Sequence, residues 1–360
     1  MNVKIGYDFD IYMKPVWEGE IQYHESIMFF PNPLNRTIEA ASLLYQPEEI
    51  WKVYSSDFGT EYQEGLDYIL KDGQINRTEN SRIPVWEYDD YYLKTPCEIE
   101  IPSVSARGRY VWVGESRHYA KMQIAVTYRK HPADRLSATS LPRCCINRLP
   151  RVCEKLKKGA PVTIVYYGDS IMTGCDASGK YGYAPNMPIY IELVTEALKH
   201  KYPHSKIITF NTAVGGTTSF WGIEEIEKRV SMYHPDLVFI GFGMNDSGLD
   251  MDVKAYERNN RMMVEKVRKE CPNTEFLFIS TTIPNPDCMG WTRWQPFYQS
   301  GLEAICKDTK GTALVRMTDL HKELLTRKRY GDMMGNGVNH PNDYLARIYA
   351  QAVAKTLGAI

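Results

Sequence analysis

Four segments in the second half of the chain carry residues suited to nucleophilic catalysis. Ser170 ends a Gly-Asp-Ser sequence after the apolar run VTIVYYG, and Gly216 lies in the segment NTAVGGTTS. Asn245 follows the run DLVFIGFG, and His340 precedes a proline near the end of the chain. A serine at a strand tip can attack a carbonyl, a histidine can take its proton, and glycine N–H or asparagine amide groups can stabilise an oxyanion. Taken singly, a Gly-Asp-Ser is also a common turn or helix cap, and paired glycines also occur in ordinary loops.

The apolar pattern that must position these residues changes near residue 160. After this point, short apolar runs alternate with segments at helical spacing, the runs being PVTIVYYG, KIITFN, DLVFIGFG, EFLFIS and TALVRM. Buried parallel strands have such continuous runs. We therefore predict an α/β domain over residues 161–360, with a doubly wound parallel five-stranded sheet flanked by helices. Ligands of such sheets gather at the carboxyl ends of the strands, where three of the four segments begin.

The first part of the chain has the pattern of antiparallel strands. Alternating runs such as IQYHESIMFF, CEIEIPSVS, YVWVGES and AKMQIAVTYR are separated by turn-rich segments. This pattern predicts a β-sandwich over residues 1–140, in which LNRTIEAASLLY and TEYQEGLDYIL are candidate short helices. Residues 141–160 carry two prolines and several basic residues. We interpret them as a linker with a short helix.

Composition excludes several classes of partner. The 360 residues contain 43 Lys plus Arg and 44 Asp plus Glu, so no net field favours nucleic acid or an anionic membrane. No stretch approaches the roughly 18 to 20 apolar residues of a membrane helix. The start MNVKIGYDFDIYMK lacks the apolar core of a signal peptide, so a cytoplasmic location is expected. The eight cysteines show neither a disulfide framework nor metal-ligand spacing and are predicted to be reduced thiols. No pattern indicates an oligomeric state.

Together the four segments resemble the SGNH, or GDSL-type, hydrolase family. The matching motifs are GDS after the first strand, N-x-x-x-G-G-T-T-S after the second, G-x-N-D after the third and H-P near the end, and they cover residues 161–360. This resemblance implies an SGNH, flavodoxin-like fold. It also implies that Ser170 is the nucleophile, that His340 is the base, and that Ser170, Gly216 and Asn245 form the oxyanion hole. It implies no metal or cofactor.

One position departs from the family pattern. The family usually has Asp three residues before the catalytic histidine, and here that position is Gly337. The histidine needs an acceptor at its other ring nitrogen to fix its tautomer. We expect either a backbone carbonyl of residues 335–338, which would give a Ser-His dyad, or the carboxylate of Asp332. Asp343 is expected to cap the last helix.

Aromatic residues near the predicted site indicate the substrate class. Trp221 follows the glycine loop, and Trp291 and Trp294 follow the fourth strand. Flat rings suit the apolar faces of sugars, although such rings also commonly pack in cores. Together with Asp169, these three tryptophans are the predicted substrate-binding residues.

A β-sandwich ahead of an SGNH domain is similar to the layout of carbohydrate esterase family 2, whose members can work with a dyad. By this resemblance the N-terminal domain is jelly-roll-like. The protein would be a serine esterase that hydrolyses O-acyl, chiefly O-acetyl, esters of carbohydrates through an acyl-enzyme, with an acylated carbohydrate as its partner. Two alternatives stay open. One is a lipid or thioester acylhydrolase of the same family, and the other is a carbohydrate-binding protein whose serine site has decayed.

Overall fold

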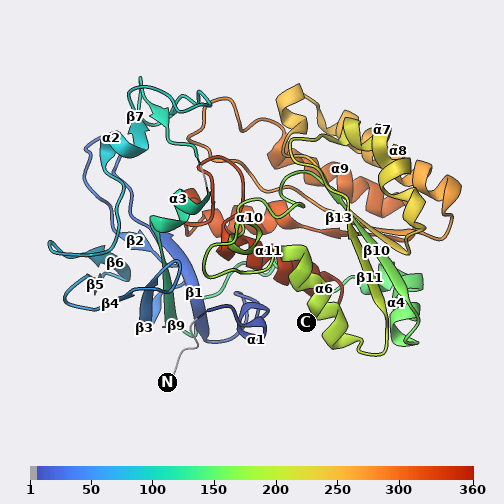
Figure 1. Cartoon of the computed structure of the whole chain (residues 1–360), viewed down its shortest axis with the longest axis horizontal. Helices are drawn as coiled ribbons and strands as arrows, with labels where there is room; N and C mark the ends of the chain where they lie inside the picture. Colours follow the sequence, from blue (N-terminus) through green and yellow to red (C-terminus); the bar gives the residue numbers. More distant parts are fainter. Residues whose placement is uncertain (1–5, 115) are drawn as a thin grey trace.

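The computed structural model describes residues 6–114 and 116–360 and contains a parallel sheet beside a region of antiparallel sheets (Figure 1). Residues 1–5 lie outside the described residues, and they are part of the N-terminal segment from which a cytoplasmic location was expected. The parallel sheet has the order β11-β10-β12-β13-β14, with bounds Ile207–Asn211, Val162–Gly168, Leu237–Gly241, Glu275–Ile279 and Thr312–Val315. Each strand falls in one of the five predicted apolar runs, and the predicted α/β class is confirmed.

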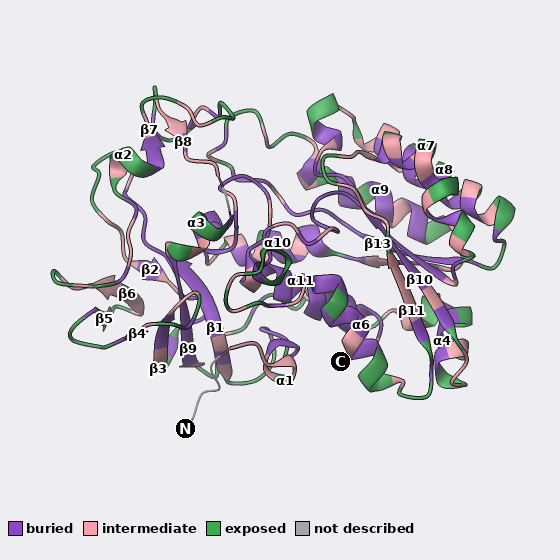
Figure 2. Cartoon of the chain, viewed as in Figure 1, coloured by how far each residue is buried: buried purple, intermediate pink, exposed green. Residues whose placement is uncertain are grey.

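Helices cover both faces of this sheet. One face carries α7 (Ser219–Arg229), α8 (Val253–Glu270) and α9 (Gln295–Asp308), which pack on one another and on one hydrophobic cluster. The second cluster includes residues of α4 (Pro150–Lys157), α6 (Tyr190–Lys201), α10 (Met317–Leu325) and α11 (Asp343–Thr356). Neighbouring residues of β10 alternate between the clusters, as Val165 and Tyr167 belong to the first and Ile164 and Tyr166 to the second. The central strands β10, β12 and β13 are therefore almost wholly buried, whereas the edge strand β11 is only partly buried (Figure 2).

The N-terminal half is sheet-rich, as predicted. Its paired strands are all antiparallel. A four-stranded sheet contains β1 (Ile21–Met28), β9 (Gln123–Lys130), β3 (Pro47–Ser55) and β4 (Glu61–Tyr62). A three-stranded sheet contains β2 (Ala41–Ser42), β6 (Gln74–Arg77) and β5 (Tyr68–Lys71), and a ribbon pairs β7 (Tyr92–Leu93) with β8 (Tyr110–Val111). The two candidate short helices were wrong, because these segments contain β2, β4 and β5 and have the side-chain alternation of strands.

Short helices complete the chain. In the N-terminal half they are α1 (Phe9–Tyr12), α2 (Tyr88–Tyr91) and α3 (Ser116–Lys121). The segment interpreted as a linker contains η1 (Ile146–Arg148) and α4, whose Val152 and Leu156 are buried in the shared cluster. The remaining elements are α5 (Ser178–Tyr181), η2 (Ser231–Tyr233), η3 (Asp246–Leu249) and η4 (Tyr330–Asp332).

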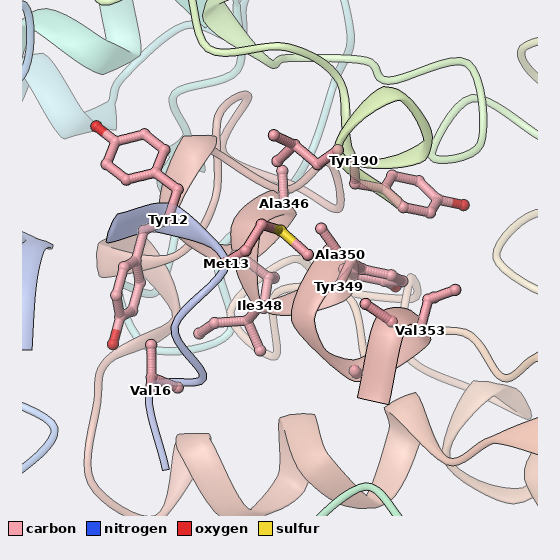
Figure 3. Close-up of a cluster of buried hydrophobic side chains, with 14 of the residues drawn as sticks. Tyr12, Met13, Val16, Tyr190, Ala346, Ile348, Tyr349, Ala350 and Val353 are labelled. Carbon is pink, nitrogen blue, oxygen red and sulfur yellow. The ribbon is translucent and has the colours of Figure 1, made fainter. Parts of the chain in front are cut away.

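The two halves share a hydrophobic core. Residues in and after α1 lie against α11 of the parallel-sheet domain (Figure 3). The Gln351 side chain donates to the Tyr12 carbonyl at 2.7 Å and accepts the Val16 N–H at 3.0 Å. Lys328 and Glu25, both fully buried, form an ion pair at 2.6 Å across the same boundary. These contacts make the N-terminal half part of the scaffold that surrounds the C-terminal loops.

Two further observations concern the chain as a whole. Within residues 6–114 and 116–360, no helix is both long and apolar enough to cross a lipid bilayer. All eight cysteines are unpaired, and four of them, Cys153, Cys271, Cys288 and Cys306, are buried.

Candidate active site

Ser170 lies in the turn that follows β10. At Gly168 the strand passes so close to β12 that an added Cβ would lie 2.4 Å from the Gly241 carbonyl oxygen, so a side chain is excluded there. The Ser170 carbonyl accepts the Cys175 N–H at 3.1 Å and the Thr173 hydroxyl at 2.7 Å. These bonds fold residues 170–175 into a compact turn and leave the Ser170 hydroxyl available to other groups.

His340 lies between a tight turn and the start of α11. The Asn336 side-chain oxygen accepts the N–H groups of Val338, Asn339 and His340 at 2.9, 3.0 and 3.2 Å. On the other side, Asn342 caps α11 by accepting the Leu345 N–H at 3.0 Å. The histidine backbone is thus fixed from both directions.

The structure joins Ser170, His340 and Asp176 in one hydrogen-bonded chain. His340 Nε2 lies 2.9 Å from the Ser170 Oγ, and His340 Nδ1 lies 2.9 Å from Asp176 Oδ2. An ionised carboxylate only accepts, so Nδ1 carries the proton and Nε2 accepts from the serine hydroxyl. The Asn336 amide nitrogen, 3.1 Å from the same Nδ1, then packs against the ring without donating to it. This is the arrangement in which a histidine can activate a serine.

The carboxylate partner of His340 was missed by the sequence analysis. Asp176 follows Ser170 by six positions, and it approaches His340 because Gly335 makes room, since a Cβ there would lie 2.5 Å from the Asp176 Cβ. Gly337 occupies the usual position of the acid. Its φ of +86° and a Cβ position only 2.5 Å from the Trp112 carbonyl oxygen exclude a side chain. The N-terminal half therefore fills the space that the usual aspartate would need.

The two predicted partners of His340 were wrong. Asp332, in η4, is fully buried and accepts the N–H of Met28 at 2.8 Å and of Arg329 at 3.2 Å. Its carboxylate thus fastens η4 to β1, because a buried carboxylate needs such donors. No backbone carbonyl is needed at Nδ1, since the Asp176 carboxylate already accepts from it. Asp343 does not cap α11 either, because Asn342 does so, and Asp343 instead accepts the Ser178 N–H at 2.8 Å.

Backbone and amide donors lie at the same edge of the sheet as Ser170. A Cβ at Gly215 would lie 3.6 Å from the Ser170 Cβ, which places the glycine loop beside the serine. In the described part of the chain, the N–H groups of Ser170 and Gly216 donate to no backbone acceptor. Asn245 uses one amide hydrogen on the Thr217 carbonyl at 2.9 Å, and its second amide hydrogen remains for a ligand. The predicted donors therefore lie on loops at the sheet edge that carries Ser170.

A buried carboxylate fixes these loops relative to one another. Asp246 Oδ1 accepts from both the backbone N–H, at 2.9 Å, and the hydroxyl of Ser219, the first residue of α7. Because Asp246 follows Asn245, this contact holds the glycine loop beside the amide. Burial raises the pKa of Asp246.

The side chain of Asp169 is buried and is not available to a substrate. It is 2% exposed and accepts the Ile171 N–H at 3.0 Å. Burial, with a smaller contribution from Asp246, raises its pKa to about 7. Its predicted role in substrate binding was wrong, because its side chain is directed into the protein, where it shapes the nucleophile turn.

A groove of about 770 Å³ opens beside His340 and Asp176. The N-terminal half supplies one wall through residues 97–99, 113–114 and 116–117, and the other wall includes Tyr181, Tyr183 and Asn336. Its lining combines polar and charged groups with tyrosine rings and aliphatic side chains. Such a volume is that of a site for a drug-sized or oligosaccharide-sized ligand.

None of the three predicted tryptophans lines this groove in the described part of the chain. Trp221 stacks on Tyr167 at 5.9 Å, Trp294 donates its indole N–H to Asp250 at 2.9 Å, and Trp291 packs against a buried cluster of the N-terminal half. Their predicted contact with substrate was wrong for this groove. Packing, the ordinary role of such rings, accounts for each of them.

The family comparison agrees with this geometry. Residues 166–348 match the model of the GDSL-like lipase/acylhydrolase family. The chain belongs to the GDSL-like lipase/acylhydrolase family. The match contains Ser170, Asp176, Gly216, Asn245 and His340, so all five residues lie in the part of the chain that the family shares.

Solved structures with related folds include several esterases. A two-domain esterase (CEX) active on acetylated mannans is 22% identical, with a TM-score of 0.50, over 62% of this chain and 56% of its own length. The same esterase co-crystallised with mannopentaose gives a TM-score of 0.49 at 22% identity, covering 62% of this chain and 57% of that one. The acetylxylan esterase Axe2 from Geobacillus stearothermophilus is 20% identical over 55% of this chain and 94% of its own, with a TM-score of 0.45. The chain thus spans little more than half the length of the two-domain esterase, and this likeness concerns the fold. A comparison with curated proteins finds no significant match.

Among the residues that the structure describes, no group of three or more His, Cys, Asp or Glu side chains is placed to hold a metal ion. The arrangement at Ser170 is instead one of proton transfer, nucleophilic attack and oxyanion stabilisation.

Proposed function

We propose that this protein is a carboxylic ester hydrolase that removes acyl groups, chiefly acetyl groups, from carbohydrates through an acyl-enzyme. The observation that carries the proposal is the chain of contacts from Ser170 Oγ to His340 Nε2 and from His340 Nδ1 to Asp176 Oδ2, each 2.9 Å long. Family membership supports ester or acyl hydrolysis as the reaction class.

In the proposed first step, Ser170 Oγ attacks the ester carbonyl carbon while its proton passes to His340 Nε2. The carbonyl oxygen becomes an oxyanion that accepts from the N–H groups of Ser170 and Gly216 and from the Asn245 amide. The Asp176 carboxylate stabilises the imidazolium that forms. The bond between the carbonyl carbon and the alcohol oxygen then breaks, and the proton on Nε2 passes to the leaving alcohol.

In the proposed second step, water attacks the acyl-enzyme. His340 takes a proton from that water, the oxyanion forms again in the same place, and the bond to Ser170 Oγ breaks as the proton returns to the serine. The products are a carboxylic acid, ionised at neutral pH, and free enzyme. Each step uses only groups that lie at this edge of the sheet.

Two features support a carbohydrate substrate. The groove of about 770 Å³ presents hydroxyl and charged groups from both halves and the amide of Asn336, and such groups can bind sugar hydroxyls. The two-domain esterase of similar fold acts on acetylated mannans, and we extend that substrate class to this chain as part of the proposal. The decayed-site alternative depended on an absent triad carboxylate, and Asp176 removes that reason.

The proposal is tested by acetate release from acetylated manno-, xylo- and gluco-oligosaccharides, with Ser170→Ala as the matched control. We expect release by the parent protein and none by the variant. Longer acyl chains hydrolysed faster than acetate in a p-nitrophenyl ester series would favour the lipid or thioester alternative. If a fluorophosphonate probe fails to label Ser170, the chain is a binding protein and the hydrolase proposal is refuted.

A further inference from the structure

A cavity of about 50 Å³ is lined by residues of both halves of the protein. It shares three wall residues, Ser116, Asp176 and Tyr183, with the groove beside His340. A water-sized group needs about 10 to 15 Å³ of such volume, so the cavity holds roughly three to five non-hydrogen atoms.

Arg347 of α11 lines this cavity without a counter-ion. It is 4% exposed, and among the described residues it has no hydrogen-bond acceptor and no ion-pair partner. The rings of Tyr12 and Tyr344 cover the guanidinium, each with its centroid 5.0 Å away. These ring contacts supply no anion, and the buried Nε of Arg347 has no hydrogen-bond partner in the described part of the chain. A guanidinium keeps its charge in proteins, so a buried one without an anion is unfavourable.

Two more buried donors in the cavity wall lack partners. The Tyr344 hydroxyl and His24 Nε2 have no hydrogen-bond partner in the structure. His24 Nδ1 lies 3.3 Å from the Tyr12 hydroxyl. When that hydroxyl donates to Nδ1, Nε2 carries the hydrogen and becomes a donor. Burial, together with the charge of Arg347, lowers the pKa of His24 to about 3, so the ring is neutral at physiological pH.

The carboxylates around the cavity are already engaged. Asp176 accepts from His340 at 2.9 Å, Asp343 accepts the Ser178 N–H at 2.8 Å, and nearby Glu25 pairs with Lys328 at 2.6 Å. None of the three lies within ion-pair distance of Arg347 in the described chain. The unpaired groups around the cavity are therefore one cation and two neutral donors.

We propose that this cavity binds a small carboxylate anion of the size of acetate. Acetate has four non-hydrogen atoms and fits the volume estimated above. Its two oxygens match the paired N–H groups at the edge of Arg347, and the hydroxyl of Tyr344 and the imidazole of His24 supply further donors. This site is separate from ester hydrolysis and exists whether or not Ser170 is a nucleophile.

The test is the melting temperature of the full-length protein in sodium acetate, compared with acetamide and with sodium chloride at equal ionic strength. Acetamide has the shape of acetate without its charge. We expect acetate to raise the melting temperature by about 2 °C or more at saturation, and acetamide and chloride to raise it less. No shift, or equal shifts with acetate and acetamide, would overturn the proposal.

Three variants locate the effect. Arg347→Met should lose the acetate response and, without acetate, should melt no lower than the parent protein, because it removes an unpaired buried charge. If it does not fold, Tyr344→Phe should weaken acetate binding about fivefold to tenfold by removing one donor. Asn245→Ala, which changes a residue outside the cavity wall, should keep the full response. Loss of the response in Asn245→Ala, or unchanged acetate affinity in Tyr344→Phe and Arg347→Met, would place the anion elsewhere and refute this site.

Discussion

Replacing Asp176 by Asn tests the unexpected member of the site. The substitution keeps the size of the side chain and removes its charge, so it changes the electrostatics at His340 Nδ1 while leaving the turn after β10 in place. The Asn336 amide, 3.1 Å from the same nitrogen, can then donate to Nδ1. The hydrogen would move to Nε2, where the histidine could no longer accept the serine proton.

The expected magnitude follows from the distance between the two charges in the transition state. An imidazolium and a carboxylate 2.9 Å apart attract each other by about 6 kcal/mol at an effective dielectric constant of about 20. His340 and Asp176 are only 21% and 8% exposed, so screening by solvent is limited. A loss of about 4 to 6 kcal/mol corresponds to a decrease in kcat of roughly 1,000- to 25,000-fold.

The assay measures kcat on p-nitrophenyl acetate per mole of folded protein, with the melting temperature recorded for each variant. Asp332→Asn is the matched control, because Asp332 is also a buried carboxylate near the histidine loop but contacts Met28 and Arg329. It should lower the melting temperature and leave kcat within about tenfold of the parent. A parental kcat in Asp176→Asn, or a collapse of kcat confined to Asp332→Asn, would refute the assignment of the acid.

Three other outcomes are expected. Gly337→Asp should lower the free energy of unfolding in urea by about 2 kcal/mol or more, because the backbone has a positive φ there and a side chain would clash with the Trp112 carbonyl. The same substitution should not restore activity to Asp176→Asn. A stable double variant with restored activity would contradict this prediction. Asn245→Ala should lower kcat about 100- to 1,000-fold with little change in KM, and a change confined to KM would argue against an oxyanion role. The pKa of Asp169 is raised to about 7 in the folded protein, so its contribution to stability is fully present below about pH 4 and is lost as pH rises to about 7. Asp169→Asn should therefore flatten the dependence of the free energy of unfolding on pH in this range, and an unchanged slope would show that Asp169 is not the group responsible.

Local patterns in the sequence were sufficient for the sheet and for most of the site. Continuous apolar runs predict buried strands, and the carboxyl ends of parallel strands meet at one edge, so Ser170, Gly216 and Asn245 were expected together. The structure places these residues at that edge. The contact between Ser170 and His340 was predicted through the family resemblance, because spacing alone does not bring residues 170 positions apart together.

Asp176 could not be predicted in the same way. Its approach to His340 depends on a glycine at position 335 and on a backbone carbonyl of the N-terminal half near Gly337, and neither leaves a periodic pattern in the sequence. The signal available was indirect, since a glycine at the usual acid position together with an aspartate in the nucleophile turn is compatible with relocation. The predicted contact of the three tryptophans with substrate was wrong for another reason. An amphipathic ring has the same sequence signature in a core and at a binding surface.

The position of Asp176 in the turn after β10 determines which parts of the chain a truncated variant must retain. Ser170 and Asp176 lie within one seven-residue segment. His340 instead belongs to a loop that the N-terminal half holds in place, because Gln123 donates to the Met334 carbonyl at 2.8 Å and Asp332 accepts the Met28 N–H. Truncating the chain to residues 161–360 would remove these two contacts on the His340 loop and leave Ser170 and Asp176 in place. A shortened variant must therefore retain β1 and β9, or contain designed contacts that hold the His340 loop in their place.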